Sequence, residues 1–504
     1  MNLGDEKLKK NIKGFDSNLY LELQTSEILK RIEQNNNKLY LEFGGKIFDD
    51  FHAERVLPGY KPNNKIKLLK KLKDDSEIIL VINSADIERN KIRADFNLTY
   101  DMEMMRLIDN LRAEGLTVSA IIITMFTGQN SAKVFGNKLE RRNEKVYYHR
   151  YTKGYPNDID MIVSDEGFGA NPFIKTTKPL VIVAAPGPNS GKLATCLSQI
   201  YHEFKNGINA GYAKYETFPV WDLPLKHPVN VAYEAATADL KDTNMIDHFH
   251  FNKYGVIAVN YNRDIESFPI IKNVFSKIFV NKEYYNSPTD MCVNMVSKAI
   301  TNDEIVQKAA VQEILRRHYN ALCDYKKGLV DMSVPERIGT LMNDLEIDKN
   351  QRKVVAHALK KCRNTNSPAF ALELHNGKII TGRTKKLIGA STACILNSLK
   401  ELSGIKDCID LIPTSTLNPI LDLNKKILHT KNEILSLKDV LIALSVSAPA
   451  NPMIVEALNH LKELKNTEAH CTFILNPVDE IILKKLGINV TCEPQFVSNN
   501  LFEH

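Results

Sequence analysis

Short apolar runs alternate with stretches of helical periodicity along the first half of the chain. Several runs are apolar throughout, which is typical of strands that helices cover on both faces. Met102–Glu114, by contrast, places most of its apolar side chains near one face of a helix. The runs lie at Lys38–Phe43, Glu77–Ile82, Thr117–Thr124, Lys145–His149, Ile159–Val163, Leu180–Ala185, Ala210–Lys214 and Val256–Asn260. Residues 1–286 are therefore predicted to form an α/β domain with a doubly wound, mostly parallel sheet.

The periodicity changes at about residue 287. Ser287 and Pro288 are typical of a helix N-cap followed by proline at the first helical position. Ile305–Tyr325 and Lys349–Cys362 then show long helical patterns without a convincing strand between them. We therefore predict a helical segment over residues 287–365.

The last part of the chain begins with a hairpin signal. Two apolar runs, Ala369–Leu374 and Ile379–Thr381, flank an Asn-Gly pair at Asn376 and Gly377. Asn-Gly favours the tight turn that joins two antiparallel strands. Short strands alternate with helices from there to the end, so residues 366–504 are predicted to form a smaller α+β or α/β subdomain.

Charge and cysteine usage narrow the classes of function. The 504 residues include 66 Lys and Arg against 60 Asp and Glu, an excess too small to indicate nucleic acid or an anionic membrane as a partner. The eight cysteines show no C-x-x-C spacing, so no zinc site is expected. No apolar run approaches the roughly 18 residues of a membrane span, and the N-terminus has no signal-peptide pattern. These features predict a cytoplasmic protein.

Leu180–Thr195 carries the strongest local signal for chemistry. An apolar run leads into a Gly-rich turn, then a lysine, then a helical pattern. In a phosphate loop, backbone amides converge on an anion and the lysine reaches its outer oxygens. The residues predicted to bind phosphate are Gly187, Asn189, Ser190, Gly191, Lys192 and Thr195, and Lys192 is also a candidate catalytic residue.

This turn departs from the usual phosphate-loop pattern at two positions. Pro186 stands where the first glycine belongs, and Leu193 replaces the hydroxyl residue that normally binds magnesium. Thr195, one helical turn later, is a possible substitute. The alternative interpretation is a Gly-rich turn that happens to carry a lysine.

Polar residues follow most of the predicted strands. Carboxyl ends of parallel strands meet at one edge of a sheet, so these residues are predicted to form a composite site, although each could also belong to a solvated turn. Cations there would bind phosphate oxygens and carboxylates could hold Mg²⁺. The candidate substrate-binding residues are Lys46, Arg55, Arg89, Arg93, Lys214 and Glu216.

Asp165 and Glu166 follow the apolar run Ile159–Val163. This position is similar to the acidic pair at the end of a Walker B strand, although here it precedes the Lys192 loop in the chain. We therefore predict that Asp165 and Glu166 are catalytic residues that bind Mg²⁺ or position a nucleophile.

Several long segments together resemble one bacterial family. These segments are Phe15–Gln24, Lys38–Asp50, Arg55–Tyr60, Ser164–Gly169, Ala185–Gln199, His227–Leu240 and Ser287–Met295. On these motifs the chain is identified as a member of the domain-of-unknown-function family eighteen-forty-six, a family of uncharacterised conserved proteins. The resemblance implies a large α/β region, a helical middle and a C-terminal subdomain similar to the cytidine-deaminase architecture without its zinc motifs. It implies no established activity.

The residues together predict an enzyme that acts on a nucleotide or another phosphorylated small molecule, with Mg²⁺ and ATP or a related ligand as cofactors. The reaction would be phosphoryl transfer or ATP-dependent ligation. One alternative is a sensor that binds a phosphorylated metabolite without turnover, which the absence of a hydroxyl after Lys192 favours. Another is a structural assembly protein. In each case we expect a homo-oligomer.

Overall fold

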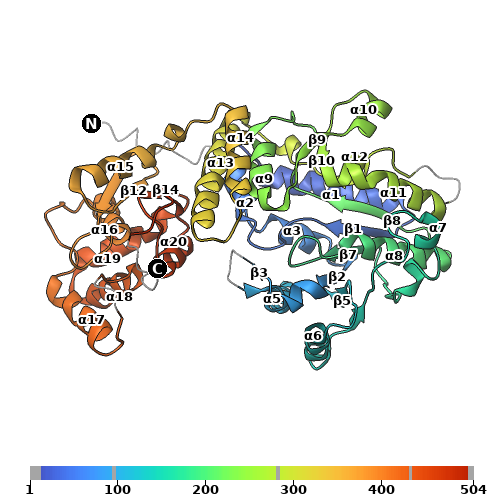
Figure 1. The fold of residues 1–504 in the computed structure, drawn as a ribbon, viewed down its shortest axis with the longest axis horizontal. Coiled ribbons are helices and arrows are strands. Elements are labelled where there is room, and N and C mark those ends of the chain that lie inside the picture. The colour runs from blue at the N-terminus through green and yellow to red at the C-terminus, as the bar shows by residue number, and fades with distance from the viewer. Residues whose placement is uncertain (1–12, 94–97, 280–283, 431–433, 498–504) are drawn as a thin grey trace. The chain divides into compact units, whose positions relative to one another are not determined.

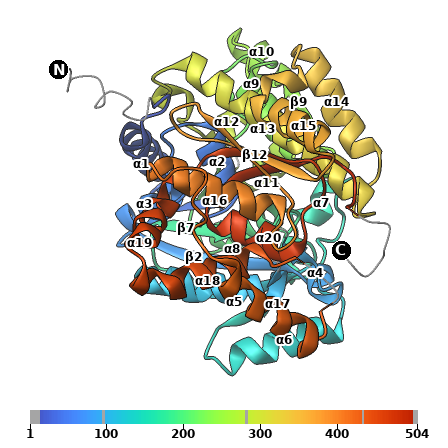
Figure 2. The ribbon, with the colours of Figure 1, turned by 90° about the vertical axis from the view of Figure 1, so that its left-hand side faces the viewer.

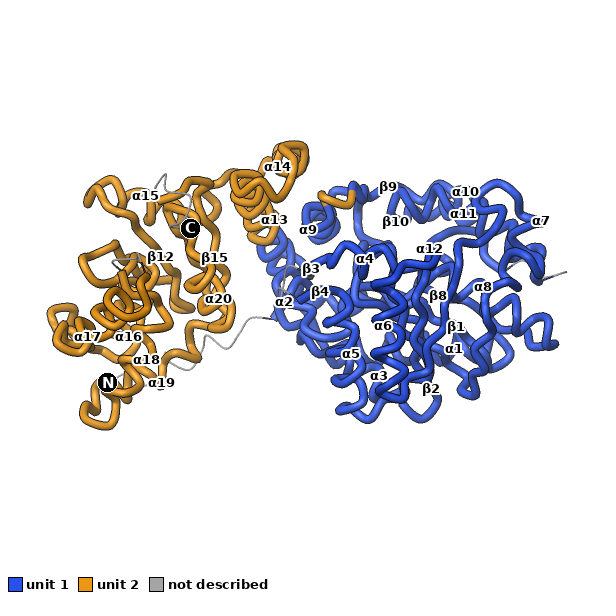
Figure 3. Tube along the Cα trace, turned by 60° about the horizontal axis from the view of Figure 1, so that its bottom comes forward, with its two compact units in different colours: residues 1–237, 241–310 blue, residues 238–240, 311–504 orange. Residues whose placement is uncertain are grey.

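The chain forms two compact units (Figure 1). A computed structural model describes residues 13–93, 98–279, 284–430 and 434–497. Unit 1 comprises the described residues of 1–237 and 241–310, and unit 2 those of 238–240 and 311–504 (Figure 3). The helices predicted as a separate middle segment over 287–365 are thus divided between the two units.

Unit 1 is built on a seven-stranded sheet with the order β11-β8-β1-β7-β2-β5-β6. All the neighbouring pairs in this sheet are parallel, which confirms the predicted parallel architecture. The strands are β1 (Leu39–Phe43), β2 (Ser76–Asn83), β5 (Val118–Thr124), β6 (Val146–Tyr148), β7 (Leu180–Ala184), β8 (Gly211–Tyr215) and β11 (Cys292–Val293).

Helices cover both faces of this sheet because its strands are apolar on both. In β2, Ile78, Leu80 and Ile82 face one hydrophobic core, and Ile79 and Val81 face the other. Each such side chain contributes about 1.5–3 kcal/mol when fully buried. The first core is completed by α1 (Ser17–Gln34), α3 (Asn64–Lys71), α5 (Tyr100–Ala113) and α6 (Asn130–Glu140), and the second by α8 (Lys192–Lys205) and α11 (Asn262–Ile278).

The order of the strands creates a topological switch point. The chain runs from β1 through α3 to β2 and later returns to place β7 between these two strands. From β7 it continues through α8 to β8, on the other side of β1. Since α3 and α8 lie on opposite faces, the loops after β1 and β7 leave the sheet in different directions, which is where open α/β sheets bind ligands.

Two predicted strands do not join this sheet. The run at 159–163 forms α7 (Ile159–Ile162), because the Asp158 carboxylate caps the helix by accepting the Met161 amide hydrogen, and Ile159 and Ile162 lie three residues apart on the same core. The run at 256–260 ends in β10 (Val259–Tyr261), which pairs with β9 (Asn244–Ile246) in a separate antiparallel ribbon.

The remaining elements of unit 1 are short. They are α2 (Phe51–Val56), α4 (Ser84–Glu88), β3 (Ile92–Arg93), β4 (Leu98–Thr99), η1 (Phe168–Ala170), α9 (Pro228–Ala236), α10 (His248–Tyr254), α12 (Pro288–Met291) and η3 (Ser297–Ala299).

Unit 2 contains a four-stranded sheet with the order β13-β12-β14-β15. The strands β12 (Ala369–Glu373) and β13 (Ile379–Arg383) form the predicted hairpin, with Gly377 in the left-handed region at φ 83°. β14 (Glu468–Cys471) is antiparallel to β12, and β15 (Asn489–Cys492) is parallel to β14. The sheet thus combines antiparallel and parallel pairs, and the resemblance to cytidine deaminases stays a prediction.

Helices account for most of unit 2, and α16, α18 and α19 pack against one another (Figure 2). One helix, α13 (Asp303–Lys326), begins in unit 1 and continues into unit 2. The others are η2 (Ala238–Leu240), α14 (Ser333–Asp344), η4 (Lys349–Gln351), α15 (Lys353–Thr365), α16 (Ala390–Leu402), α17 (Thr414–Lys426), α18 (Leu437–Ser447), η5 (Ala448–Ala450), α19 (Pro452–Asn459), η6 (His460–Leu464) and α20 (Pro477–Lys485).

A buried ion network inside unit 2 connects α13 and Arg352 to the strands β14 and β15. The guanidinium of Arg352 is inaccessible to solvent and donates to Glu468 (2.5 Å), to the Thr491 hydroxyl (2.9 Å) and to two backbone carbonyls. Arg316 of α13 donates to the other oxygen of Glu468 at 2.7 Å. Burial would raise the pKa of Glu468, but the two arginines hold it below its ordinary value.

Replacing Arg352 with methionine should strongly destabilise unit 2. The change leaves one oxygen of Glu468 and two backbone carbonyls without their buried donor, and breaking a buried ion pair costs about 3–5 kcal/mol. Native-state hydrogen exchange of the β14 and β15 amides should show this loss, while Arg383→Met, at an exposed position of β13, should leave exchange unchanged. Equal protection in the two variants would contradict the assigned role.

Candidate anion site at the carboxyl edge of the large sheet

The turn between β7 and α8 is held in place through its carbonyl groups. The Thr124 hydroxyl, at the end of β5, donates to the carbonyl of Ser190 at 2.7 Å. The side-chain amide of Asn83, at the end of β2, donates to the carbonyl of Asn189 at 3.2 Å. The turn therefore lies over the ends of two neighbouring strands, with these two carbonyls facing protein donors.

The amide hydrogens of the same turn have no protein acceptor among the described residues. This holds for Gly187, Asn189, Ser190, Gly191 and Lys192. Gly191, at φ 85°, is the N-cap of α8, and Asn189 is also left-handed at φ 53°. The unused amides thus stand at the positive end of a 14-residue helix.

Gly187 is required by close packing. A β-carbon at this position would lie 2.4 Å from the ring of Tyr100. Any other residue would push the turn away from α5, so glycine here fixes the path of the backbone ahead of α8.

Two hydroxyl groups in this region are buried without a hydrogen-bond partner. Ser190 is 3% exposed and Thr195, in the first turn of α8, is 1% exposed. Within the part of the chain that the structure describes, neither Ser190 Oγ nor Thr195 Oγ1 meets a donor or acceptor. Buried polar groups are nearly always paired, so a pair of unpaired hydroxyls next to unused amides marks a place prepared for a polar ligand.

Substitution of these hydroxyls separates a structural role from a ligand role. Ser190→Ala and Thr195→Val should leave the free energy of unfolding unchanged or raise it by up to about 1 kcal/mol, because each removes an unpaired buried group. Urea denaturation of the ligand-free protein would measure this. A loss of more than about 1 kcal/mol in either variant would show that the hydroxyl has a protein partner.

A cluster of charged side chains lies beside the turn on the α8 and α11 face of the sheet. The Lys192 Nζ atom is 3.9 Å from the Glu42 carboxylate. Sheet register places Glu42 next to Lys214, whose ammonium contacts Glu216 at 2.7 Å and Asp264 at 2.5 Å. We refer to these five residues as the charged cluster.

Three carboxylates share two ammonium groups in this cluster, which shapes its protonation. Burial would lower the pKa of Lys214, but Asp264 and Glu216 hold it well above its ordinary value. Burial raises the pKa of Glu216 to about 7, and the negative charge of Asp264 adds to the shift that Lys214 opposes. Lys214 therefore stays charged, whereas Glu216 changes its protonation near neutral pH.

The stability of Glu216→Gln should exceed that of the wild type increasingly as pH rises. In the fold Glu216 keeps its proton up to about pH 7, whereas in the unfolded chain it ionises near its ordinary value of 4.5. Folding therefore takes up a proton between these values, and the contribution of Glu216 to stability falls as pH rises through them. Gln cannot ionise, so the difference in Tm between variant and wild type should grow from about pH 5 to about pH 8.

Glu266→Gln is a matched control for this measurement, because it removes the same charge at an exposed position of α11. Its difference in Tm from the wild type should not change over that range. A constant difference for Glu216→Gln would mean that this carboxylate ionises at its ordinary pKa.

Among the predicted substrate-binding residues whose side chains are described, only Lys214 and Glu216 belong to the charged cluster. Lys46 follows β1 and Arg55 lies in α2, and both are half-buried, whereas Arg89 is exposed after α4. Arg93 lies in β3, and its side chain is outside the described residues.

Asp165 and Glu166 lie at the other end of α8 from Lys192. Asp165 accepts a hydrogen bond from the Tyr201 hydroxyl at 2.7 Å and pairs with Lys205. Tyr201 is nine residues beyond Lys192, which corresponds to about 14 Å along a helix. The two acidic side chains are 81% and 68% exposed, and Glu166 pairs with Lys153. The predicted combination of this acidic pair with Lys192 is therefore not formed.

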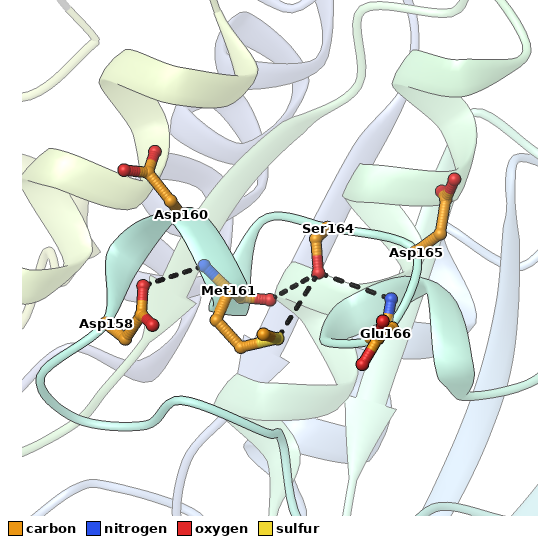
Figure 4. A pocket seen from close by; sticks show the side chains of 6 residues that line it. All are labelled: Asp158, Asp160, Met161, Ser164, Asp165 and Glu166. Atoms are coloured by element: carbon orange, nitrogen blue, oxygen red, sulfur yellow. Dashed lines mark hydrogen bonds between the residues drawn. The ribbon is translucent and has the colours of Figure 1, made fainter.

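The carboxylates that line the hollow around Asp165 and Glu166 do not point toward a common centre. Figure 4 shows that those of Asp158, Asp160 and Asp165 do not converge on one point. Across all the described ranges, no three His, Cys, Asp or Glu side chains are arranged so that they could hold a metal ion. Mg²⁺ is usually held by one or two carboxylates together with substrate phosphates, so the Mg²⁺ predicted at Asp165 and Glu166 stays a prediction.

The predicted site residues did not include Glu42, and Asp264 was expected only among the polar residues that follow the run at 256–260. Glu42 lies within a predicted strand that is otherwise largely apolar, two residues after Tyr40 and on the same face. A single carboxylate at the end of a buried strand was the available signal. Asp264 reaches the cluster from the first turn of α11 rather than from a strand of the large sheet.

Fold and site together define an open, parallel α/β protein with an amide-lined turn and a charged cluster at its topological switch point. The chain belongs to the family described as "Domain of unknown function DUF1846". The N-terminal domain of this family matches residues 13–346, and its C-terminal domain matches residues 350–502.

Relatives resemble the chain over almost its whole length. A "UPF0371 protein" of Clostridium tetani (strain Massachusetts / E88) is 53% identical over 97% of this chain and 99% of its own length. Two UPF0371 proteins from Clostridium botulinum are 52% identical in strain Kyoto / Type A2 and 51% in strain Eklund 17B / Type B, with the same coverage. Separately, none of the helices among the described residues is long and apolar enough to cross a bilayer.

Proposed function

We propose that the protein binds a phosphorylated small molecule at the turn Gly187–Gly191 with Lys192, and that it is an enzyme of phosphoryl transfer or ATP-dependent ligation. The observation that carries this proposal is the group of unused backbone amides beside the unpaired hydroxyls of Ser190 and Thr195. No acceptor among the described residues meets these groups, whereas a phosphate would offer several oxygens at once.

Lys192 supports an anion at this place. The Lys192 side chain is 14% exposed, and the Glu42 carboxylate is 3.9 Å from its ammonium, which is beyond a normal hydrogen bond. It is therefore not committed to a tight ion pair within the protein. An arriving phosphate would gain a charge-assisted contact from Lys192 and the favourable field of the α8 N-terminus.

The charged cluster favours turnover over binding alone. A carboxyl group that titrates near neutral pH, held next to an ammonium group, is typical of acid–base chemistry. A sensor for a phosphorylated metabolite is the second candidate, because Leu193 stands where nucleotide hydrolases carry a hydroxyl. The expected cytoplasmic location and homo-oligomeric state belong to the same proposal.

Lys192→Ala should weaken the binding of ATP, measured with and without Mg²⁺, by about 10- to 100-fold, as expected for losing a hydrogen bond to a charged group. Isothermal titration calorimetry would measure this, with ADP and pyrophosphate as shorter probes. Lys205→Ala, at the opposite end of the same helix, is the matched control and should bind as the wild type does.

Failure of the wild type to bind ATP, ADP and pyrophosphate would overturn the proposal. Mass spectrometry of the ligand after incubation distinguishes the two candidates. Conversion of the ligand indicates an enzyme, and tight binding of an unchanged ligand indicates a sensor.

A further inference from the structure

The carboxylates of the charged cluster form the side of the proposed phosphate site that faces β8 and α11. Glu42 links the two parts, since it is 3.9 Å from Lys192 and in register with Lys214. Each of Glu42, Lys214, Glu216 and Asp264 keeps a small exposed fraction, from 10 to 23% of the side chain. A group bound next to the phosphate would therefore meet an acidic wall.

We propose that Glu216 is the catalytic base of a phosphoryl transfer, and that the acceptor is a hydroxyl compound rather than a carboxylate. This inference rests on the proposed function. Carboxylates accept hydrogen bonds from hydroxyl groups and repel other carboxylates, so the acidic wall suits a polyol or sugar-like acceptor. It opposes the carboxylic acid that most ATP-dependent ligations would activate.

The contacts of the three carboxylates single out Glu216. Glu42 accepts the Tyr212 hydroxyl on one oxygen at 2.9 Å and has Lys192 near the other. Asp264 lies in the first turn of α11 and is held by Lys214 at 2.5 Å. Glu216 uses one oxygen for Lys214, and its other oxygen meets, within the described ranges, only the weak donor of the Cys292 thiol at 3.8 Å.

The step balances without a further reactant. The acceptor hydroxyl gives its proton to Glu216 Oε2 as its oxygen forms a bond to the phosphorus of a phosphorylated donor. The bond between phosphorus and the leaving oxygen breaks, and its electron pair stays with that oxygen. Lys192 and the turn amides would stabilise the negative charge that develops on the phosphate oxygens.

The pH dependence of such a step depends on the groups that face Glu216. These are Lys214 of β8, Glu42 of β1, Asp264 of α11, Cys292 of β11, Tyr233 of α9 and Tyr261 of β10. Only Lys214 among them carries a positive charge, and burial with these neighbours raises the pKa of Glu216 to about 7. The rate should therefore increase as pH rises from about 6 to about 8.

Phosphate release from Mg²⁺·ATP, with water as the acceptor, tests the base. Glu216→Gln should lower the rate at least about tenfold and abolish its rise with pH, because a positioned base contributes about 10²–10⁴-fold. Affinity for a non-hydrolysable ATP analogue should stay within about threefold of the wild type, since Glu216 does not hold the phosphate in this proposal. Glu266→Gln should match the wild type in both measurements.

The outcomes separate this inference from the proposed function. No binding of the analogue by the wild type would overturn both. Binding with no phosphate release, or equal release by wild type and Glu216→Gln, would overturn the role of Glu216 alone. The acceptor class is tested by two incubations with ATP. If a mixture of carboxylic acids yields acyl phosphates that hydroxylamine traps, the proposed acceptor class is wrong. If a mixture of pentoses, hexoses and glycerol yields phosphate esters in ³¹P spectra, it is supported.

Discussion

Two hydrogen bonds decide what the turn after β7 can do. Thr124 and Asn83 bind the carbonyls of Ser190 and Asn189, so the peptide planes between them are oriented by the strands below. A carbonyl that faces the sheet sets the direction of the amide on the other side of its plane. The donors are thereby left without protein partners at the start of α8, and their placement follows from the sheet rather than from the loop sequence alone.

The charged cluster replaces part of a hydrophobic core and has a cost. Tyr40 and Tyr212 continue the core on the α8 and α11 face, but the next positions on the same face are Glu42 and Lys214. Charges at such depth lose several kcal/mol of hydration each, which pairing only partly offsets. Because three carboxylates face only two ammonium groups, the cluster is less stable than one with balanced charges.

Much of unit 1 could be predicted from local patterns. All-apolar runs such as Leu180–Ala185 gave the strands of the parallel sheet, and Gly187 and Lys192 indicated the turn. The run at 159–163 was misjudged because a short apolar segment fits a strand or a helix equally well, and the capping contact of Asp158 decides between them. The periodicity of the sequence shows the length of α8. It does not show where the loop that carries Asp165 contacts this helix, and the distance from Asp165 to Lys192 depends on that contact. Glu42 became significant only when the register of β1 and β8 was known.

The ion network of unit 2 crosses the boundary between the two family domains. Arg316 and Glu313 belong to the stretch matched by the N-terminal domain, and Glu468 and Arg352 belong to the stretch matched by the C-terminal one. The two stretches therefore share a buried interior in unit 2. A gene divided between residues 346 and 350 would separate Glu468 from Arg316, one of its two arginine partners. The relatives match both stretches over almost their full length, as contacts shared between the two stretches require.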